Sequence, residues 1–94
     1  MTTIMEFHEA ALYALRDRIM TTAADDDRTP QQELDGLSDR GLAAYWHGYR
    51  TAVGNGLTGY ALHAAAFRAA LTAPTDAAHA DTKRLRQVLT QSLA

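Results

Sequence analysis

The large apolar side chains of this sequence recur every three or four residues, and no segment alternates apolar and polar residues as a β-strand does. The β-branched apolar residues that strands favour are scarce, since valine and isoleucine occur only twice each. In the first segment, by contrast, Ile4, Leu15 and Ile19 fall on one side of a helix. The sequence therefore predicts an all-α fold.

Capping and turn residues divide the chain into five predicted helices. Thr3 followed by Glu6, and Thr29 followed by Gln32, have the spacing of capping boxes. The strongest turn signal is the Gly-Asn-Gly sequence at 54–56. At 94 residues the chain is predicted to form a single helical domain spanning 1–94. We expect a compact bundle of four main helices, at about 4–23, 39–53, 58–72 and 75–92, plus one short helix at about 30–36.

The composition argues against several classes of protein. The chain has no cysteine, so it forms neither a disulfide framework nor a thiolate zinc site. No uninterrupted apolar run comes near the ~20 residues that a membrane span needs. The N-terminal residues lack the basic region of a secretory signal. We therefore expect a cytoplasmic protein that does not associate with membranes.

Charged residues of both signs are scattered, and the formal net charge of −2 argues against extensive phosphate binding. The last predicted helix is more basic, and its candidate anion-binding residues are His79, Lys83, Arg84 and Arg86. These residues support an alternative function, in which the protein binds nucleic acid or modulates transcription. The simpler interpretation is a solvated helix face, because cations are favourable in the C-terminal half of a helix.

The sequence AYWHGYR at 44–50 groups three aromatic side chains with a histidine and an arginine. Trp46 and Tyr49 share a helical face with Leu42, which predicts that both rings lie in the core. Gly48 belongs to an adjacent stripe of small residues, and small side chains at that spacing let a second helix approach closely. A ligand pocket lined by the aromatic rings is the alternative.

The turn at 54–56 suggests which side chains meet these rings. If the next helix folds back alongside, Trp46 lies level with Ala64 and Ala65, so bulky rings meet small side chains. Leu62 then points away from the seam between the two helices. The residues predicted to face the seam follow a three-four spacing and are Leu57, Tyr60, Ala64, Phe67 and Leu71.

No residue pattern points to catalysis. Serine occurs only at Ser38 and Ser92, a predicted N-cap and a frayed helix end, so no activated nucleophile is indicated. His47 and His63 are level across the predicted turn, but two ligands do not make a metal site. We therefore expect no enzyme, no catalytic residues, no cofactor and no metal ion.

A protein-binding function rests on side chains that the predicted core leaves outside. Tyr13 and Met20 fall on the polar side of the first helix, where exposed apolar side chains suggest a contact surface. Acidic residues gather after this helix and would complement a basic partner. The candidate partner-binding residues are Tyr13, Met20, Asp25, Asp26, Asp27, Glu33 and Asp35.

The balance of residue types also suggests an origin and an oligomeric state. Lys83 is the only lysine among nine basic residues, and alanine is abundant, as is typical of a bacterial or bacteriophage genome rich in G and C. Alanine buries little surface, so the core is modest and a homodimer is expected. We interpret the chain as a non-catalytic accessory protein that binds and inhibits a larger host protein of unknown identity.

Overall fold

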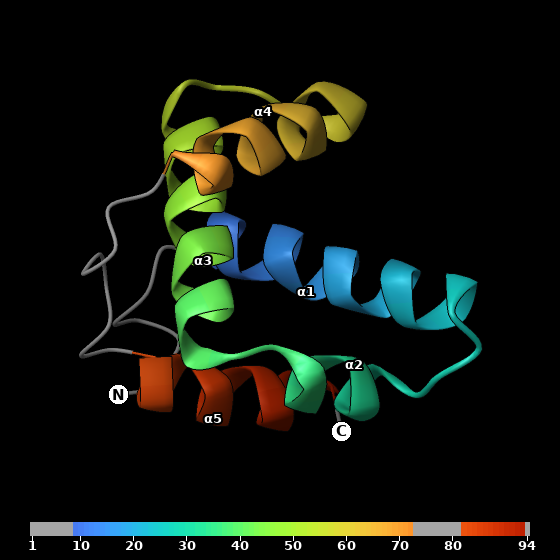
Figure 1. Ribbon diagram of the computed structural model, residues 1–94. Helices are drawn as coiled ribbons and strands as arrows, with labels where there is room; N and C mark the ends of the chain where they lie inside the picture. Colours follow the sequence, from blue (N-terminus) through green and yellow to red (C-terminus); the bar gives the residue numbers. More distant parts are fainter. Residues whose placement is uncertain (1–8, 73–81, 94) are drawn as a thin grey trace.

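The computed structural model describes residues 9–72 and 82–93, and all regular structure in these two ranges is helical (Figure 1). The helices are α1 (Glu9–Asp25), α2 (Pro30–Gly36), α3 (Asp39–Gly54), α4 (Gly59–Leu71) and α5 (Thr82–Leu93). The predicted all-α fold, with four main helices and one short helix, is confirmed. The predicted starts of the first and last helices, at 4 and 75, lie outside the described residues, as does the Thr3–Glu6 capping box.

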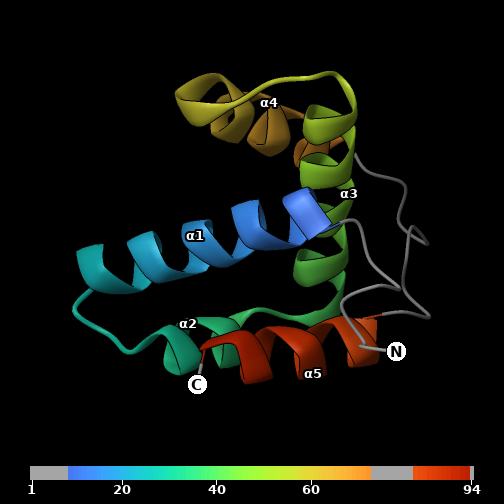
Figure 2. The ribbon, with the colours of Figure 1, turned by 180° about the vertical axis from the view of Figure 1, so that it is seen from behind.

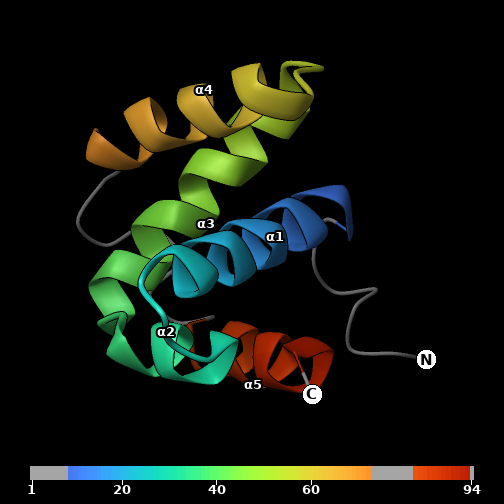
Figure 3. The same ribbon diagram turned by 90° about the vertical axis from the view of Figure 1, so that its right-hand side faces the viewer.

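The long axis of α3 passes across all the other helices. Figures 1 and 2 show α4 at one end of α3, α1 against its middle, and α2 beside α5 at the other end. The side view in Figure 3 keeps the same order. Helix α1 therefore lies between α4 and the α2–α5 pair, and the core forms where these layers meet α3.

The core consists of one apolar face from each helix. The ring of Trp46 is 2% exposed and that of Tyr49 is 1% exposed, so the prediction that AYWHGYR supplies the core is confirmed. Burying a side chain of this kind stabilises a fold by about 1.5–3 kcal/mol. The other large apolar residues of the core are Leu12, Leu15, Ile19, Leu34, Leu42, Leu62, Leu85, Val88 and Leu89.

Local side-chain chemistry begins α2 and α3 at the predicted residues. The backbone N–H of Gln32 donates to Thr29 Oγ1 at 3.1 Å, and the N–H of Thr29 donates to Gln32 Oε1 at 2.9 Å. This confirms the capping box. Ser38 caps α3 by accepting a hydrogen bond from the N–H of Gly41 at 3.0 Å.

Helix α1 ends among three aspartates in a motif that normally uses glycine. The N–H of Arg28 donates to the carbonyl of Ala23 at 2.8 Å, and the N–H of Asp27 donates to that of Ala24 at 3.2 Å. These two bonds define a Schellman motif with Asp27 at its left-handed position, where φ is 58°. A side chain at this φ strains the backbone, although aspartate tolerates it better than most residues.

Helices α3 and α4 approach so closely that a side chain at Gly48 has no room. A Cβ built there would lie 2.1 Å from the carbonyl oxygen of Ala66 and 3.2 Å from the backbone nitrogen of Ala70. The predicted role of the small-residue stripe is thus confirmed at Gly48. Figure 1 shows that α4 crosses α3 and does not return alongside it, so the level-by-level pairing expected of a hairpin is wrong.

The predicted buried face of α4 is also wrong. Leu62 and Ala66 are buried against α3, whereas Tyr60, Phe67 and Leu71 are exposed. The reason is that alanine occupies every side of α4, so several faces are apolar and the large residues do not mark the buried one. Close approach at Gly48 selects the face with the small Ala66.

Gly48→Ala should lower the free energy of unfolding by about 1–3 kcal/mol, because the new methyl group overlaps the backbone of α4. Gly54→Ala is the matched control in the same helix, since nothing lies within 4 Å of its added Cβ. The control should be neutral or stabilising by up to about 1 kcal/mol. Urea unfolding of both variants measures this, and equal effects would contradict the close crossing.

Asp27→Gly should raise the free energy of unfolding by about 0.5 kcal/mol, because glycine adopts the left-handed conformation without strain. Asp27→Ala removes the same charge but keeps a Cβ, so it should be less stable than the glycine variant. Thermal unfolding compares the two. An alanine variant as stable as the glycine variant would show that the gain comes from the lost charge alone.

Candidate functional site

The outer face of α4 carries large apolar side chains that no other described element covers. Tyr60 is 89% exposed, Leu71 is 72% exposed and Phe67 is 43% exposed. Together with Ala64 these residues follow the three-four spacing of a helix-packing face. We call Tyr60, Ala64, Phe67 and Leu71 the α4 stripe. Exposed apolar surface of this kind often marks a contact surface.

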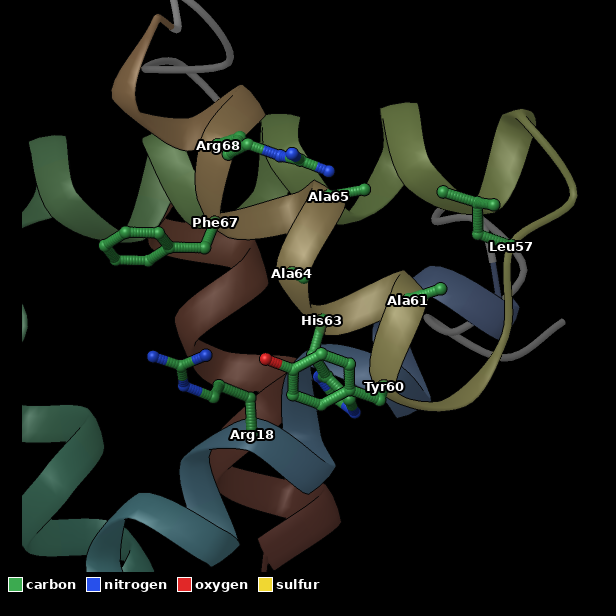
Figure 4. Close-up of a pocket in the computed structure, with 9 residues that line it drawn as sticks. All are labelled: Arg18, Leu57, Tyr60, Ala61, His63, Ala64, Ala65, Phe67 and Arg68. Atoms are coloured by element: carbon green, nitrogen blue, oxygen red, sulfur yellow. The ribbon is translucent and has the colours of Figure 1, made fainter.

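A groove of about 850 Å³ runs along one side of the α4 stripe. Arg18 comes from α1, and the other lining residues come from α4 and the loop before it (Figure 4). Figure 4 shows the Arg18 side chain beneath α4, with Phe67 on one side of the view and Tyr60 on the other. The lining residues of this α4 groove are Arg18, Leu57, Tyr60, Ala61, His63, Ala64, Ala65, Phe67 and Arg68.

The charged side chains that line the α4 groove are basic. Arg18 and Arg68 line it from two helices, and none of the nine lining residues is acidic. An adjoining hollow of about 340 Å³ shares Arg18 and His63 and adds one carboxylate, that of Asp25. The chain as a whole carries more acidic than basic residues, so this groove differs in sign from the average surface.

A hydrogen bond between α3 and α4 holds His63, one of the residues that line this groove. Tyr49 Oη lies 2.6 Å from His63 Nδ1, and the two rings meet edge to face with centroids 5.5 Å apart. Burial raises the pKa of the Tyr49 hydroxyl, and the Arg18 guanidinium opposes this effect because it favours the phenolate. The guanidinium also lies over the Tyr45 ring, 5.8 Å from its centroid.

The residues that line the α4 groove are of kinds found in binding surfaces. The groove combines aromatic and alanine side chains with guanidinium groups, and none of its nine lining residues is a serine, threonine or cysteine. Within the described ranges 9–72 and 82–93, no three histidine, aspartate or glutamate side chains gather where they could hold a metal ion. The ring nitrogen Nδ1 of His63 is instead hydrogen-bonded to the hydroxyl of Tyr49.

The predicted partner-binding residues of α1 lie on a different surface. Tyr13 and Met20 are 43% and 39% exposed, as expected for a contact surface. Their positions on the helix are turned away from that of Arg18, so they do not extend the α4 groove. The sequence therefore identifies one exposed apolar pair, and the structure adds a larger exposed stripe on α4.

The predicted acidic surface is partly neutralised from within. Arg28 forms ion pairs with Asp26, at 3.7 Å, and with Glu33. Asp35 accepts a hydrogen bond from Gln31 Nε2 at 2.9 Å. Asp25, Asp26, Asp27 and Asp35 are nonetheless exposed, whereas Glu33 is partly buried.

The predicted anion-binding stripe of the last helix is interrupted at Arg86. Its guanidinium donates to the carbonyls of Leu34 at 2.8 Å and Leu37 at 2.9 Å, and it pairs with Asp39 at 3.0 Å. Arg86 therefore satisfies the C-terminus of α2 and is not directed at an outside anion. Lys83 and Arg84 are exposed, and His79 lies outside the described residues.

Comparison with protein-family models, curated proteins and solved structures finds no match to this chain. Among the described residues, no helix combines the length and the apolar character needed to cross a membrane. Function therefore has to be inferred from the α4 groove and stripe themselves.

Sequence reasoning identifies the α4 stripe but assigns it to the core. The three-four spacing of Tyr60, Phe67 and Leu71 is visible in the sequence, and such spacing indicates packing without saying against what. Arg18 and Arg68 are missed as functional candidates. They are about 50 residues apart in sequence, and no local pattern joins them.

Tyr49→Phe should lower the free energy of unfolding by about 1 kcal/mol near pH 7, because it removes the hydrogen bond to His63. The difference should shrink above the ordinary tyrosine pKa of 10.0. Burial raises the pKa of Tyr49 in the folded protein. The protonated hydroxyl therefore makes its full contribution to stability below the ordinary pKa, which applies to the unfolded chain. This contribution is lost as the pH rises through the folded pKa.

Urea unfolding of the natural chain and of Tyr49→Phe, at about pH 7 and about pH 10.5, measures this narrowing. The three other tyrosines are common to both proteins, so their titration cancels in the comparison. A difference that stays constant over this pH range would contradict a raised pKa at Tyr49.

Proposed function

We propose that this protein acts without catalysis, by binding another protein through the α4 stripe and the adjoining α4 groove. The observation that carries the proposal is the exposure of Tyr60 and Leu71, at 89% and 72%. Leaving these side chains in water forgoes the stabilisation that burial would give, which a partner supplies when it covers them. Tyrosine is also among the residues that contribute most to protein interfaces.

The shape of the surface supports a helical partner segment. The alanines at 61, 64 and 65 leave shallow space between Tyr60 and Phe67. A helix can approach closely over small side chains while its larger residues pack between the aromatic rings. The described part of the chain offers no strand edge that an extended peptide could join.

The biological setting that we propose is that of a small bacterial or bacteriophage accessory protein that modulates a larger host protein. The alanine-rich, lysine-poor composition supports that origin. The small size, and a groove lined by no serine, threonine or cysteine, suit a protein whose effect is to occupy a surface. Nucleic-acid binding has weaker support, because Arg86 is committed to α2.

A double variant, Tyr60→Gln with Leu71→Gln, should abolish partner capture and leave the fold intact. Both side chains are exposed, so the free energy of unfolding should change by no more than about 0.5 kcal/mol. The natural chain and the double variant are immobilised side by side, and proteins retained from a bacterial lysate are compared. Circular dichroism and urea unfolding verify the fold of each.

Tyr13→Gln with Met20→Gln is the matched control, since it also replaces two exposed apolar side chains by glutamine. This control should retain the partner as the natural chain does. Capture that survives in the α4 variant, or that is lost only in the α1 variant, would contradict the assignment of the binding surface to α4.

A further inference from the structure

The α4 groove and stripe also indicate the chemistry of the partner, and this inference rests on the proposed function above. Arg18 lines the groove from α1 and Arg68 from α4, and none of the lining residues carries a carboxylate. The formal charge of the whole chain is −2, so general attraction to the protein does not favour an acidic partner. Such a partner is favoured at the groove, where the guanidinium groups of Arg18 and Arg68 lie, with the carboxylate of Asp25 confined to the adjoining hollow.

The positions of the two arginines suit the flanks of a docked helix. The α4 stripe has the three-four spacing by which one helix packs against another. Arg68 is next to Phe67 in the chain, at the edge of the stripe, while Arg18 reaches the groove from the neighbouring helix. In helix pairs of this kind, charged residues beside the apolar seam select the partner and its orientation.

We propose that the α4 groove binds an amphipathic acidic helix of another protein. Its apolar residues, at three-four spacing, pack between Tyr60 and Phe67, and its flanking carboxylates pair with Arg18 and Arg68. Guanidinium groups suit this role because they hold carboxylates in a two-pronged geometry that a lysine does not reproduce.

A second copy of the chain fits this groove less well. Symmetric pairing would place α4 of one copy on α4 of the other, and the sequence GYALHAAAFRAAL of α4 contains no aspartate or glutamate. Such a pair would bury apolar surface but would bring no α4 carboxylate to Arg68. Charge complementarity therefore favours a foreign acidic helix over self-association through α4.

The test uses three synthetic helical peptides of about 18 residues that share leucines at three-four spacing on an alanine background. The positions beside the leucines carry glutamate in the first peptide, glutamine in the second and lysine in the third. Each peptide carries a fluorescent label, and its dissociation constant for the full chain is measured by anisotropy. Circular dichroism checks that all three have similar helix content.

The glutamate peptide should bind about five-fold or more tightly than the glutamine peptide, and the lysine peptide should bind most weakly. Arg68→Glu should reverse this order, so that the lysine peptide binds better than the glutamate peptide. Lys83→Glu is the matched control, because it makes the same change in net charge at an exposed position on a different helix, α5. It should leave the order unchanged. The preference for glutamate should also weaken as salt is added.

Each other result overturns the inference in a way that separates it from the proposed function. Equal binding of the three peptides would contradict an acidic helix as the partner. The same conclusion would follow if no peptide bound while lysate capture still required Tyr60 and Leu71. In both cases the proposal that a partner binds α4 would stand. Light scattering that shows a dimer, dissociated by Tyr60→Gln with Leu71→Gln, would identify a second copy as the occupant. If the substitutions in the α4 stripe changed neither peptide binding nor lysate capture, both proposals would be overturned.

Discussion

The contact on which the rest of the structure depends is the crossing of α3 and α4 at Gly48. The carbonyl of Ala66 occupies the space that any side chain at this position would need. Because the two backbones touch there, α4 is fixed with Leu62 and Ala66 inward. The same rotation brings His63 to Tyr49 and turns Tyr60, Phe67 and Leu71 outward. The packing of α4 in the core and the exposure of the α4 stripe therefore both depend on one small residue.

The helices and their caps could be predicted from the sequence because their causes are local. Thr29 and Gln32 are three residues apart, and their hydrogen bonds form within one turn. The buried face of α4 could not be predicted in this way. Large apolar residues usually mark the inward face of a helix, but in α4 alanine makes several faces equally apolar. The buried face of α4 is decided by the close approach of the two backbones at Gly48, and the large residues of α4 contribute nothing to that approach.

The candidate site was harder to predict than the fold because it joins distant parts of the chain. Arg18 and Arg68 come together only when α1 and α4 are both placed around α3. The sequence also suggests an anion-binding role for Arg86, since it lies in a basic segment. That side chain instead donates to the carbonyls of Leu34 and Leu37 at the C-terminus of α2, where the N–H of the C-cap residue Leu37 also donates to Leu34. Neither the meeting of Arg18 with Arg68 nor the bonding of Arg86 to α2 can be predicted from residues that are close together in the sequence.

The bonds of Arg86 have a consequence for how the chain is completed during synthesis. The corner between α2 and α3 obtains its donor from a residue 52 positions after Leu34, in the last helix of the described chain. Until α5 has left the ribosome, the carbonyls of Leu34 and Leu37 lack the guanidinium donor, and Asp39 lacks its ion-pair partner Arg86. Helix α5 thus stabilises a corner of the molecule that is synthesised much earlier, and that corner gains these bonds only when α5 packs against α2.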